Sequence, residues 1–313
     1  MKKPVLVIVC GPTATGKSAL AIKLAREFGG EVVGADSMQV YRYMDIGTAK
    51  PTVEERAEVR HHLIDVVNPD EDFNAGMYVE KARQAVETLN HERKPAWVVG
   101  GTGLYIRALT AGLVDGPGTD KNLRARYVRE MKEYGIRYLH EKLKIKDREA
   151  AERIHPNDAV RVMRALEYIE TSGEPLSLRQ RNHRFADRPY DCLKIGMTDE
   201  RAFLYRKIDS RCDRMVKNGL VGEVEGLLAR GFAEDLRPMQ SLGYRHIVRH
   251  LTEGLPLAEA LSLMKQDTRN YAKRQMTWFR ADREVRWFGS ADWDGIRKEV
   301  EAFLGGMEAV EMS

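Results

Sequence analysis

The feature that most constrains the fold is a glycine-rich loop near the amino terminus, and it follows an apolar run at residues 4–10. The loop matches the pattern G-x-x-x-x-G-K-S/T at every fixed position. Its residues are Gly11, Pro12, Thr13, Ala14, Thr15, Gly16, Lys17 and Ser18. In such a loop the backbone N–H groups point inward at an anion, and the following helix presents its positive end. The loop therefore predicts a site for phosphate groups between a buried strand and a helix.

Strand and helix patterns alternate along the first hundred residues. Continuous apolar runs predict buried strands at residues 4–10, 31–36 and 96–101, and amphipathic spacing predicts helices at 17–28, 76–91 and 104–111. A further strand at 192–198 precedes a mainly helical region that contains a short strand at 285–288. This alternation predicts an α/β fold: a P-loop NTPase-like parallel sheet with helices on both faces and ligands at the carboxyl ends of the strands.

The pattern changes at the turn-rich stretch Leu113–Asp120. From residue 115 to residue 188 the sequence has no strand pattern, and charged residues recur on helical spacing. We therefore expect an inserted all-helical domain at 115–188, with residues 1–114 and 189–313 forming the catalytic core.

Composition excludes several classes of protein. The chain has 313 residues, three scattered cysteines and no apolar stretch near the length of a membrane span. We therefore expect neither a disulfide framework nor a cysteine-based zinc site, and we expect a cytoplasmic protein that is a monomer and binds no membrane. The net charge of +4 permits a nucleic-acid partner without requiring one.

The identity of the phosphate ligand depends on what stands at the other strand ends. A nucleotide hydrolase or kinase usually has an acid there that holds Mg²⁺. Here the strand at 96–101 ends in glycines, and Asp36, after the strand at 31–36, is the acid in this region. The strings Gly34–Arg42 and Gly100–Leu109 should both face the phosphate loop across one crevice.

At this point the sequence resembles the tRNA dimethylallyltransferases of bacterial type. The resemblance covers nearly the whole chain and rests on several strings in order. These are GPTATGKS, Asp36–Arg42, Gly100–Tyr105, His155–Asp158 with Arg161 and Arg164–Glu167, Ser241–His246 and Thr268–Arg280. Such enzymes transfer the five-carbon group of dimethylallyl diphosphate to the exocyclic N6 amine of the adenosine on the 3′ side of the anticodon, position 37 of tRNA. The resemblance thus implies that the phosphate loop holds diphosphate, the leaving group, with Mg²⁺ on Ser18.

The reaction suggests roles for three further residues. Asp36 would accept the proton of the attacking amine as a general base. Arg211 would join the loop around the diphosphate, although the family's R-I-x-x-R helix reads Lys207-Ile208-Asp209-Ser210-Arg211 here. Thr102 is either a turn hydroxyl or a group that hydrogen-bonds the adenine or its backbone.

Two regions are expected to contact tRNA, the substrate partner beside dimethylallyl diphosphate. In related enzymes the insertion grips the anticodon stem-loop, and basic residues recur on its predicted helices, although a solvated surface explains that pattern equally well. The target base should be read in the crevice. The candidate tRNA contacts are Asp36, Ser37, Met38, Gln39, Thr102, Arg124, Arg126, Arg161 and Arg164.

Three alternatives remain open at this stage. An isopentenyltransferase acting on free adenine nucleotide would need neither the insertion nor the basic carboxyl-terminal helix. A P-loop kinase would need the acid that is missing at the strand end. A non-catalytic RNA-binding module would not need Asp36 and the loop at one crevice.

Overall fold

The computed structural model describes residues 3–113, 120–183 and 187–311. The chain divides into two compact units: unit 1 comprises residues 1–110 and 188–313, and unit 2 comprises residues 111–187. The insertion expected at 115–188 corresponds to unit 2, and most of the predicted exit at Leu113–Asp120 lies outside the described residues.

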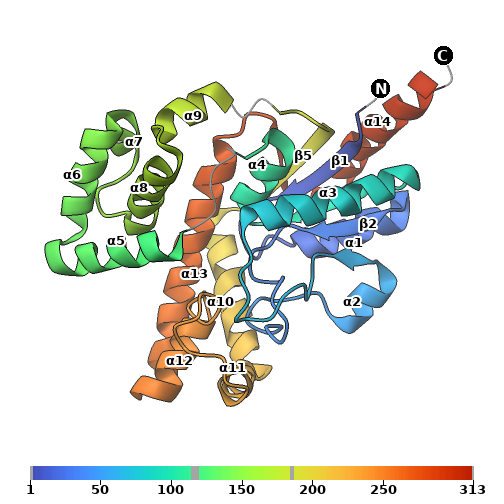
Figure 1. Ribbon diagram of the computed structural model, residues 1–313. Coiled ribbons are helices and arrows are strands. Elements are labelled where there is room, and N and C mark those ends of the chain that lie inside the picture. Colours follow the sequence, from blue (N-terminus) through green and yellow to red (C-terminus); the bar gives the residue numbers. More distant parts are fainter. Residues whose placement is uncertain (1–2, 114–119, 184–186, 312–313) are drawn as a thin grey trace. The chain divides into compact units, whose positions relative to one another are not determined.

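Unit 1 is built on a parallel sheet, which confirms the predicted fold class (Figure 1). The strand order is β3-β2-β4-β1-β5-β6, so β1 lies between β4 and β5. The strands are β1 (Val5–Cys10), β2 (Glu31–Gly34), β3 (His61–His62), β4 (Ala96–Gly100), β5 (Asp191–Thr198) and β6 (Val285–Gly289). Every residue of β1 and β4 is buried, as continuous apolar runs in a covered parallel sheet require.

Helices pack on both faces of this sheet because alternate strand residues point to opposite sides. On one face, Val7 and Val9 of β1 share a core cluster with α1 (Lys17–Phe28) and α14 (Trp293–Glu311). The side chains at Leu6 and Ile8 are directed to the other face, where α3 (Ala75–His91) contacts β2 and β4. Tyr78 of α3 stacks on Tyr105 of α4 (Gly103–Ala111), with ring centroids 4.2 Å apart.

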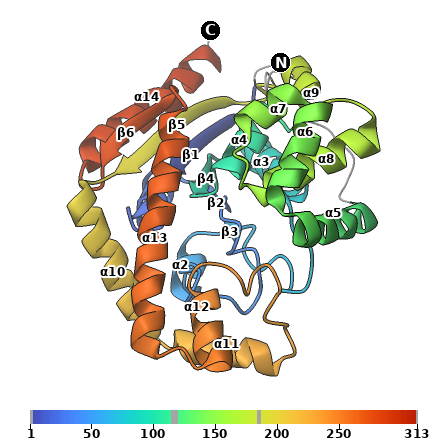
Figure 2. The same ribbon diagram turned by 90° about the vertical axis from the view of Figure 1, so that its left-hand side faces the viewer.

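The remaining helices of unit 1 form a second layer beyond the carboxyl ends of the strands. Figure 2 shows α10 (Arg201–Lys217) and α13 (Leu257–Arg280) side by side, with α11 (Leu220–Ala229) and α12 (Tyr244–Glu253) at their far ends. The short helix α2 (Val53–Glu58) and the edge strand β3 were not predicted from the sequence.

Unit 2 is all-helical over the part that the structure describes. A core that includes Tyr127, Leu139, Leu143, Val162 and Leu166 holds its helices together. They are α5 (Lys121–Tyr134), α6 (Ile136–Lys146), α7 (Arg148–Arg153), α8 (Ala159–Ser172) and α9 (Leu176–His183). Among the described residues of both units, no helix is long and apolar enough to cross a bilayer.

Candidate active site

The phosphate loop joins β1 to α1, and its backbone is fixed by contacts within the loop and with β5. Gly11 has a φ of +132°, and a Cβ there would lie 2.4 Å from the carbonyl oxygen of Met197. Gly16 adopts the left-handed conformation at the start of α1. The buried hydroxyl of Thr15 donates to the Pro12 carbonyl at 2.9 Å. The glycines of the motif thus allow a close approach to β5 and a tight entry into the helix.

A single side chain, Gln275 of α13, connects this loop to the end of β4. The Thr13 N–H donates to Oε1 of Gln275 at 2.9 Å, and Nε2 of Gln275 donates to the Gly101 carbonyl at 2.9 Å. A Cβ on Gly101 would lie 2.1 Å from that Nε2. A Cβ on Gly100 would lie 2.0 Å from the carbonyl oxygen of Ala35. The Ala35 backbone thus leaves no room for a side chain at Gly100, and a side chain at Gly101 would displace the Gln275 amide.

Asp36 follows β2 and begins a turn. Its Oδ1 accepts the N–H groups of Met38 at 2.8 Å and Gln39 at 3.3 Å. Ser37 donates its N–H to Oγ1 of Thr102 at 3.0 Å, so the predicted Thr102 hydroxyl fixes the turn that carries Asp36. Among the described residues no hydrogen bond to Oδ2 of Asp36 is formed, and this oxygen is available to a ligand.

Charged groups from three elements act on one another at the phosphate loop. Burial, and after it the positive charge of Arg211, lowers the pKa of Lys17 to about 8, while the Asp36 carboxylate acts in the opposite direction. Burial also lowers the pKa of Arg211, and Asp36 again opposes the shift. The ammonium of Lys17 donates to the Pro12 carbonyl at 2.6 Å. Two desolvated cations beside one carboxylate form a place where a bound polyanion would be stabilised.

Asp36 and Arg211 line a cavity of about 340 Å³ within unit 1, whereas Lys17 is not among the described residues of its wall. Its wall includes Thr13 of the phosphate loop, Asp36 after β2, Arg211 of α10, and Tyr271 and Arg274 of α13. Burial and the nearby Asp36 charge raise the pKa of the Tyr271 hydroxyl, so it stays neutral.

The predicted site residues of unit 1 fall into two groups. Ser37 and Met38 line this cavity together with Asp36, Arg211 and Thr13. In the described chain Thr102 and Gln39 are not lining residues, because Thr102 bonds to Ser37 and the Gln39 amide donates to the carbonyls at residues 48 and 49. Ser18 is exposed in the first turn of α1.

In unit 2 all four predicted tRNA-contacting arginines are paired with acids. Arg124 lies 2.8 Å and Arg164 3.7 Å from carboxylate oxygens of Glu167, whose side chain is 1 % exposed. Burial raises the pKa of Glu167, and the two guanidinium groups oppose that shift. Arg126 pairs with Glu170. Arg161 pairs with Asp158 at 3.4 Å and is 65 % exposed.

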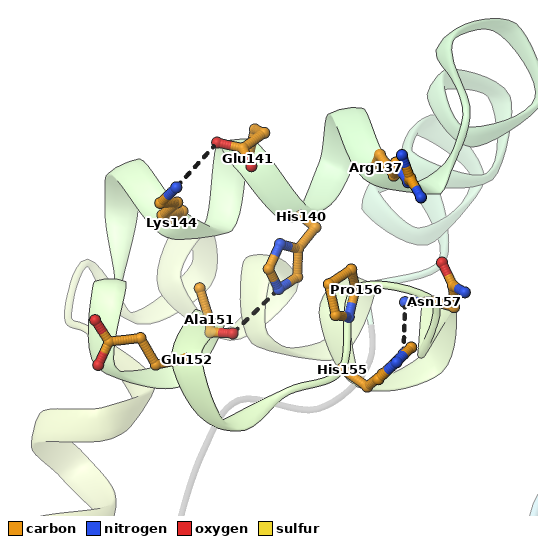
Figure 3. Close-up of a pocket in the computed structure, with 9 residues that line it drawn as sticks. All are labelled: Arg137, His140, Glu141, Lys144, Ala151, Glu152, His155, Pro156 and Asn157. Atoms are coloured by element: carbon orange, nitrogen blue, oxygen red, sulfur yellow. Dashed lines mark hydrogen bonds and ion pairs between the residues drawn. The ribbon is translucent and has the colours of Figure 1, made fainter.

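The string His155–Asp158 has a structural role within unit 2. Nδ1 of His155 accepts the Asn157 N–H at 3.1 Å, and Asp158 caps α8 by accepting the Arg161 N–H at 3.1 Å. Figure 3 shows His155 and Asn157 on the wall of a second cavity, opposite His140, whose Nε2 contacts the Ala151 carbonyl. On this wall Arg137 and Lys144 are matched in number by Glu141 and Glu152.

Sequence reasoning missed Gln275 as a group of the site. Tyr271, Gln275, Trp278 and Phe279 recur at helical spacing, which is typical of a core-facing stripe on α13. Gln275 and Phe279 are buried, but Trp278 is 37 % exposed and Tyr271 lines the cavity. Polar Gln275 within an otherwise apolar stripe was the available signal, because a buried amide requires partners.

Comparisons with known proteins agree on one family. The family model described as IPP transferase matches residues 39–282. The tRNA dimethylallyltransferase of Geobacter metallireducens is 54 % identical over 303 residues, covering 96 % of this chain and 98 % of that protein. The tRNA dimethylallyltransferase 2 of Syntrophus aciditrophicus is 51 % identical over 306 residues, covering 98 % of each.

Solved structures give the same result. The tRNA isopentenylpyrophosphate transferase of Bacillus halodurans superposes with a TM-score of 0.73 at 38 % identity, covering 99 % of this chain and 100 % of that one. A eukaryotic dimethylallyltransferase acting on tRNA gives a TM-score of 0.79 at 27 % identity, covering 93 % of this chain and 75 % of that one.

Proposed function

Because the chain belongs to the tRNA dimethylallyltransferase (IPP transferase) family, we propose that it transfers the dimethylallyl group of dimethylallyl diphosphate to tRNA. The acceptor is the exocyclic N6 amine of adenosine 37, on the 3′ side of the anticodon, and diphosphate is released. The observation that carries the proposal is the cavity beside the phosphate loop, where Asp36 and Arg211 line the wall together with Thr13 of the loop.

In this proposal a C–N bond forms as the C–O bond to diphosphate breaks. The adenine amine is a weak nucleophile because its lone pair is delocalised into the ring. Oδ2 of Asp36 accepts the proton that the nitrogen loses, while Oδ1 keeps the turn in place. Negative charge grows on the departing diphosphate, and Lys17, Arg211 and the N–H groups of the loop stabilise it.

We expect Mg²⁺ to accompany the diphosphate. The Ser18 hydroxyl is exposed in the first turn of α1, beside the loop that would hold the phosphates. No cluster of three or more His, Cys, Asp or Glu side chains suited to a metal occurs among the described residues. The Ser18 hydroxyl would help to hold this ion together with the diphosphate, and the ion would supply positive charge that neutralises the leaving group.

For tRNA, we propose that Ser37 and Met38 contact the target nucleotide in the cavity of unit 1, with Thr102 and Gln39 supporting their turn. In unit 2, Arg161 is the best placed of the predicted arginines for a phosphate contact, because its side chain is 65 % exposed. Arg124, Arg126 and Arg164 are less exposed than Arg161, and all four arginines pair with acids. A monomeric state and a cytoplasmic location belong to the same proposal.

The test is incubation of the protein with radiolabelled dimethylallyl diphosphate, Mg²⁺ and unmodified tRNA. Label on adenosine 37 is the expected result, and nuclease digestion with chromatography locates it. Label on free adenosine monophosphate instead would favour the isopentenyltransferase acting on nucleotides. Release of phosphate from ATP, with no labelled RNA, would favour a kinase or hydrolase.

A further inference from the structure

Glu223 of α11 makes an unusual set of contacts with a loop that forms one wall of the cavity. Its carboxylate accepts the backbone N–H groups of Asp45 at 2.9 Å, Ile46 at 2.7 Å and Gly47 at 3.1 Å. It also accepts the hydroxyl of Tyr244, at 2.5 Å. Four donors thus converge on one carboxylate, and three of them belong to consecutive residues of the loop.

Close packing strengthens the same connection. A Cβ on Gly47 would lie 2.4 Å from Cε2 of the Tyr244 ring and 2.9 Å from Cδ1 of Leu220. Tyr244 is fully buried, and both burial and the Glu223 charge raise the pKa of its hydroxyl, which therefore stays a donor. Because Gly47 has no side chain, the backbone of the loop can pack directly against α11 and α12.

The loop is held at its other side by contacts that lead back to Asp36. Nε2 of Gln39 donates to the carbonyls of Thr48 at 3.2 Å and Ala49 at 3.1 Å. The Gln39 N–H itself donates to Oδ1 of Asp36. Gly47 and Thr48 line the same cavity as Asp36. The segment from Asp36 to Ala49 is therefore held together by its own hydrogen bonds and is also hydrogen-bonded to α11.

We propose that Glu223 is a positioning residue: it fastens the Asp36–Ala49 segment to the α11–α12 pair and so fixes the general base relative to Arg211 on α10. The inference rests on the proposed function, and it assigns Glu223 no contact with either substrate. Misplacement of a reacting group by about 1 Å can lower a rate ~10²-fold. The phosphate loop belongs to other elements, so diphosphate binding should be nearly independent of Glu223.

The experiment compares Glu223→Gln with Glu225→Gln, an exposed residue of the same helix. A glutamine keeps the size but replaces one acceptor oxygen with an NH₂ group, which faces backbone donors instead of accepting from them. Three quantities are measured: hydrogen exchange of the amides at residues 45–47, kcat for dimethylallyl transfer to tRNA, and the affinity for inorganic diphosphate by calorimetry.

We expect Glu223→Gln to exchange these amides faster and to lower kcat by ~10- to 100-fold, with diphosphate affinity within about threefold of the control. Unchanged exchange, or faster exchange with the kcat of the control, would overturn the inference. Absence of transfer by the wild-type chain would refute the proposed function itself. Should Glu223→Gln fail to fold, Tyr244→Phe removes one donor while keeping the ring against Gly47, and the same comparison applies.

Discussion

Replacing Asp36 by asparagine separates the two roles that the structure gives this side chain. Oδ1 accepts the N–H groups of Met38 and Gln39, and the carbonyl oxygen of asparagine can accept both. The turn should therefore persist, although loss of the carboxylate charge removes the group that opposes the lowered pKa of Lys17 and of Arg211. The second oxygen becomes an NH₂ group that cannot take a proton. Loss of a general base should lower kcat by ~10²- to 10⁴-fold, equivalent to about 2.7–5.4 kcal/mol in the barrier.

Asp36→Ala provides a contrast, because it also removes the turn acceptor and should lower stability by about 1 kcal/mol. Asp70→Asn, at an exposed loop position, serves as the matched control. Transfer of label to tRNA is followed in single-turnover mode at saturating donor, and stability is followed by urea denaturation. If Asp36→Asn keeps its rate within tenfold of the control while diphosphate still binds, Asp36 is not the base.

Three further perturbations follow from the geometry. Gly101→Ala places a Cβ 2.1 Å from the glutamine amide of α13. It should lower the free energy of unfolding, measured by denaturant titration, by about 1–3 kcal/mol. The control Gly222→Ala lies in open space on α11 and should cause no such loss. Arg161→Gln should reduce the slope of log tRNA affinity against log salt by about one; an unchanged slope would exclude a phosphate contact. Because the pKa of Lys17 is lowered to about 8, its ammonium is lost as pH rises through that value, and the affinity for inorganic diphosphate should fall above pH 8. The arginine in Lys17→Arg does not titrate in this range. If the diphosphate affinity of the wild-type protein and of Lys17→Arg fell in parallel, the pH dependence would come from titration of the diphosphate.

The sequence predicted the sheet well because buried parallel strands have a simple signal. The five predicted strands correspond to β1, β2, β4, β5 and β6, and the helices predicted at 17–28, 76–91 and 104–111 correspond to α1, α3 and α4, whose first residues differ from the expected ones by at most one position. The edge strand β3 was missed because it has two residues, His61 and His62, both partly exposed, and no apolar run. Helix α2 was missed although Thr52 and Glu55 form a capping box, which is readable in the sequence.

The candidate site was predictable only where its residues share a local motif. The phosphate loop and the turn at Asp36 are such motifs. The bond from Thr13 to Gln275 joins residues 262 positions apart, and the contacts of Glu223 with residues 45–47 span more than 175 positions. Nothing in the local sequence around Glu223 distinguishes it from its exposed neighbour Glu225. The spacing of charges in the sequence also could not show that the buried Glu167 pairs with two arginines.

The amide of Gln275 has a consequence for how the two substrates influence each other. Its Oε1 accepts a hydrogen bond from the phosphate loop, which is proposed to bind the prenyl donor. Its Nε2 donates to the end of β4, next to Thr102, which supports the turn proposed to contact the tRNA. A movement at either end must be transmitted to the other or break a hydrogen bond. Affinity for the prenyl donor and affinity for the RNA should therefore be thermodynamically linked, with each ligand changing the dissociation constant of the other by the same factor.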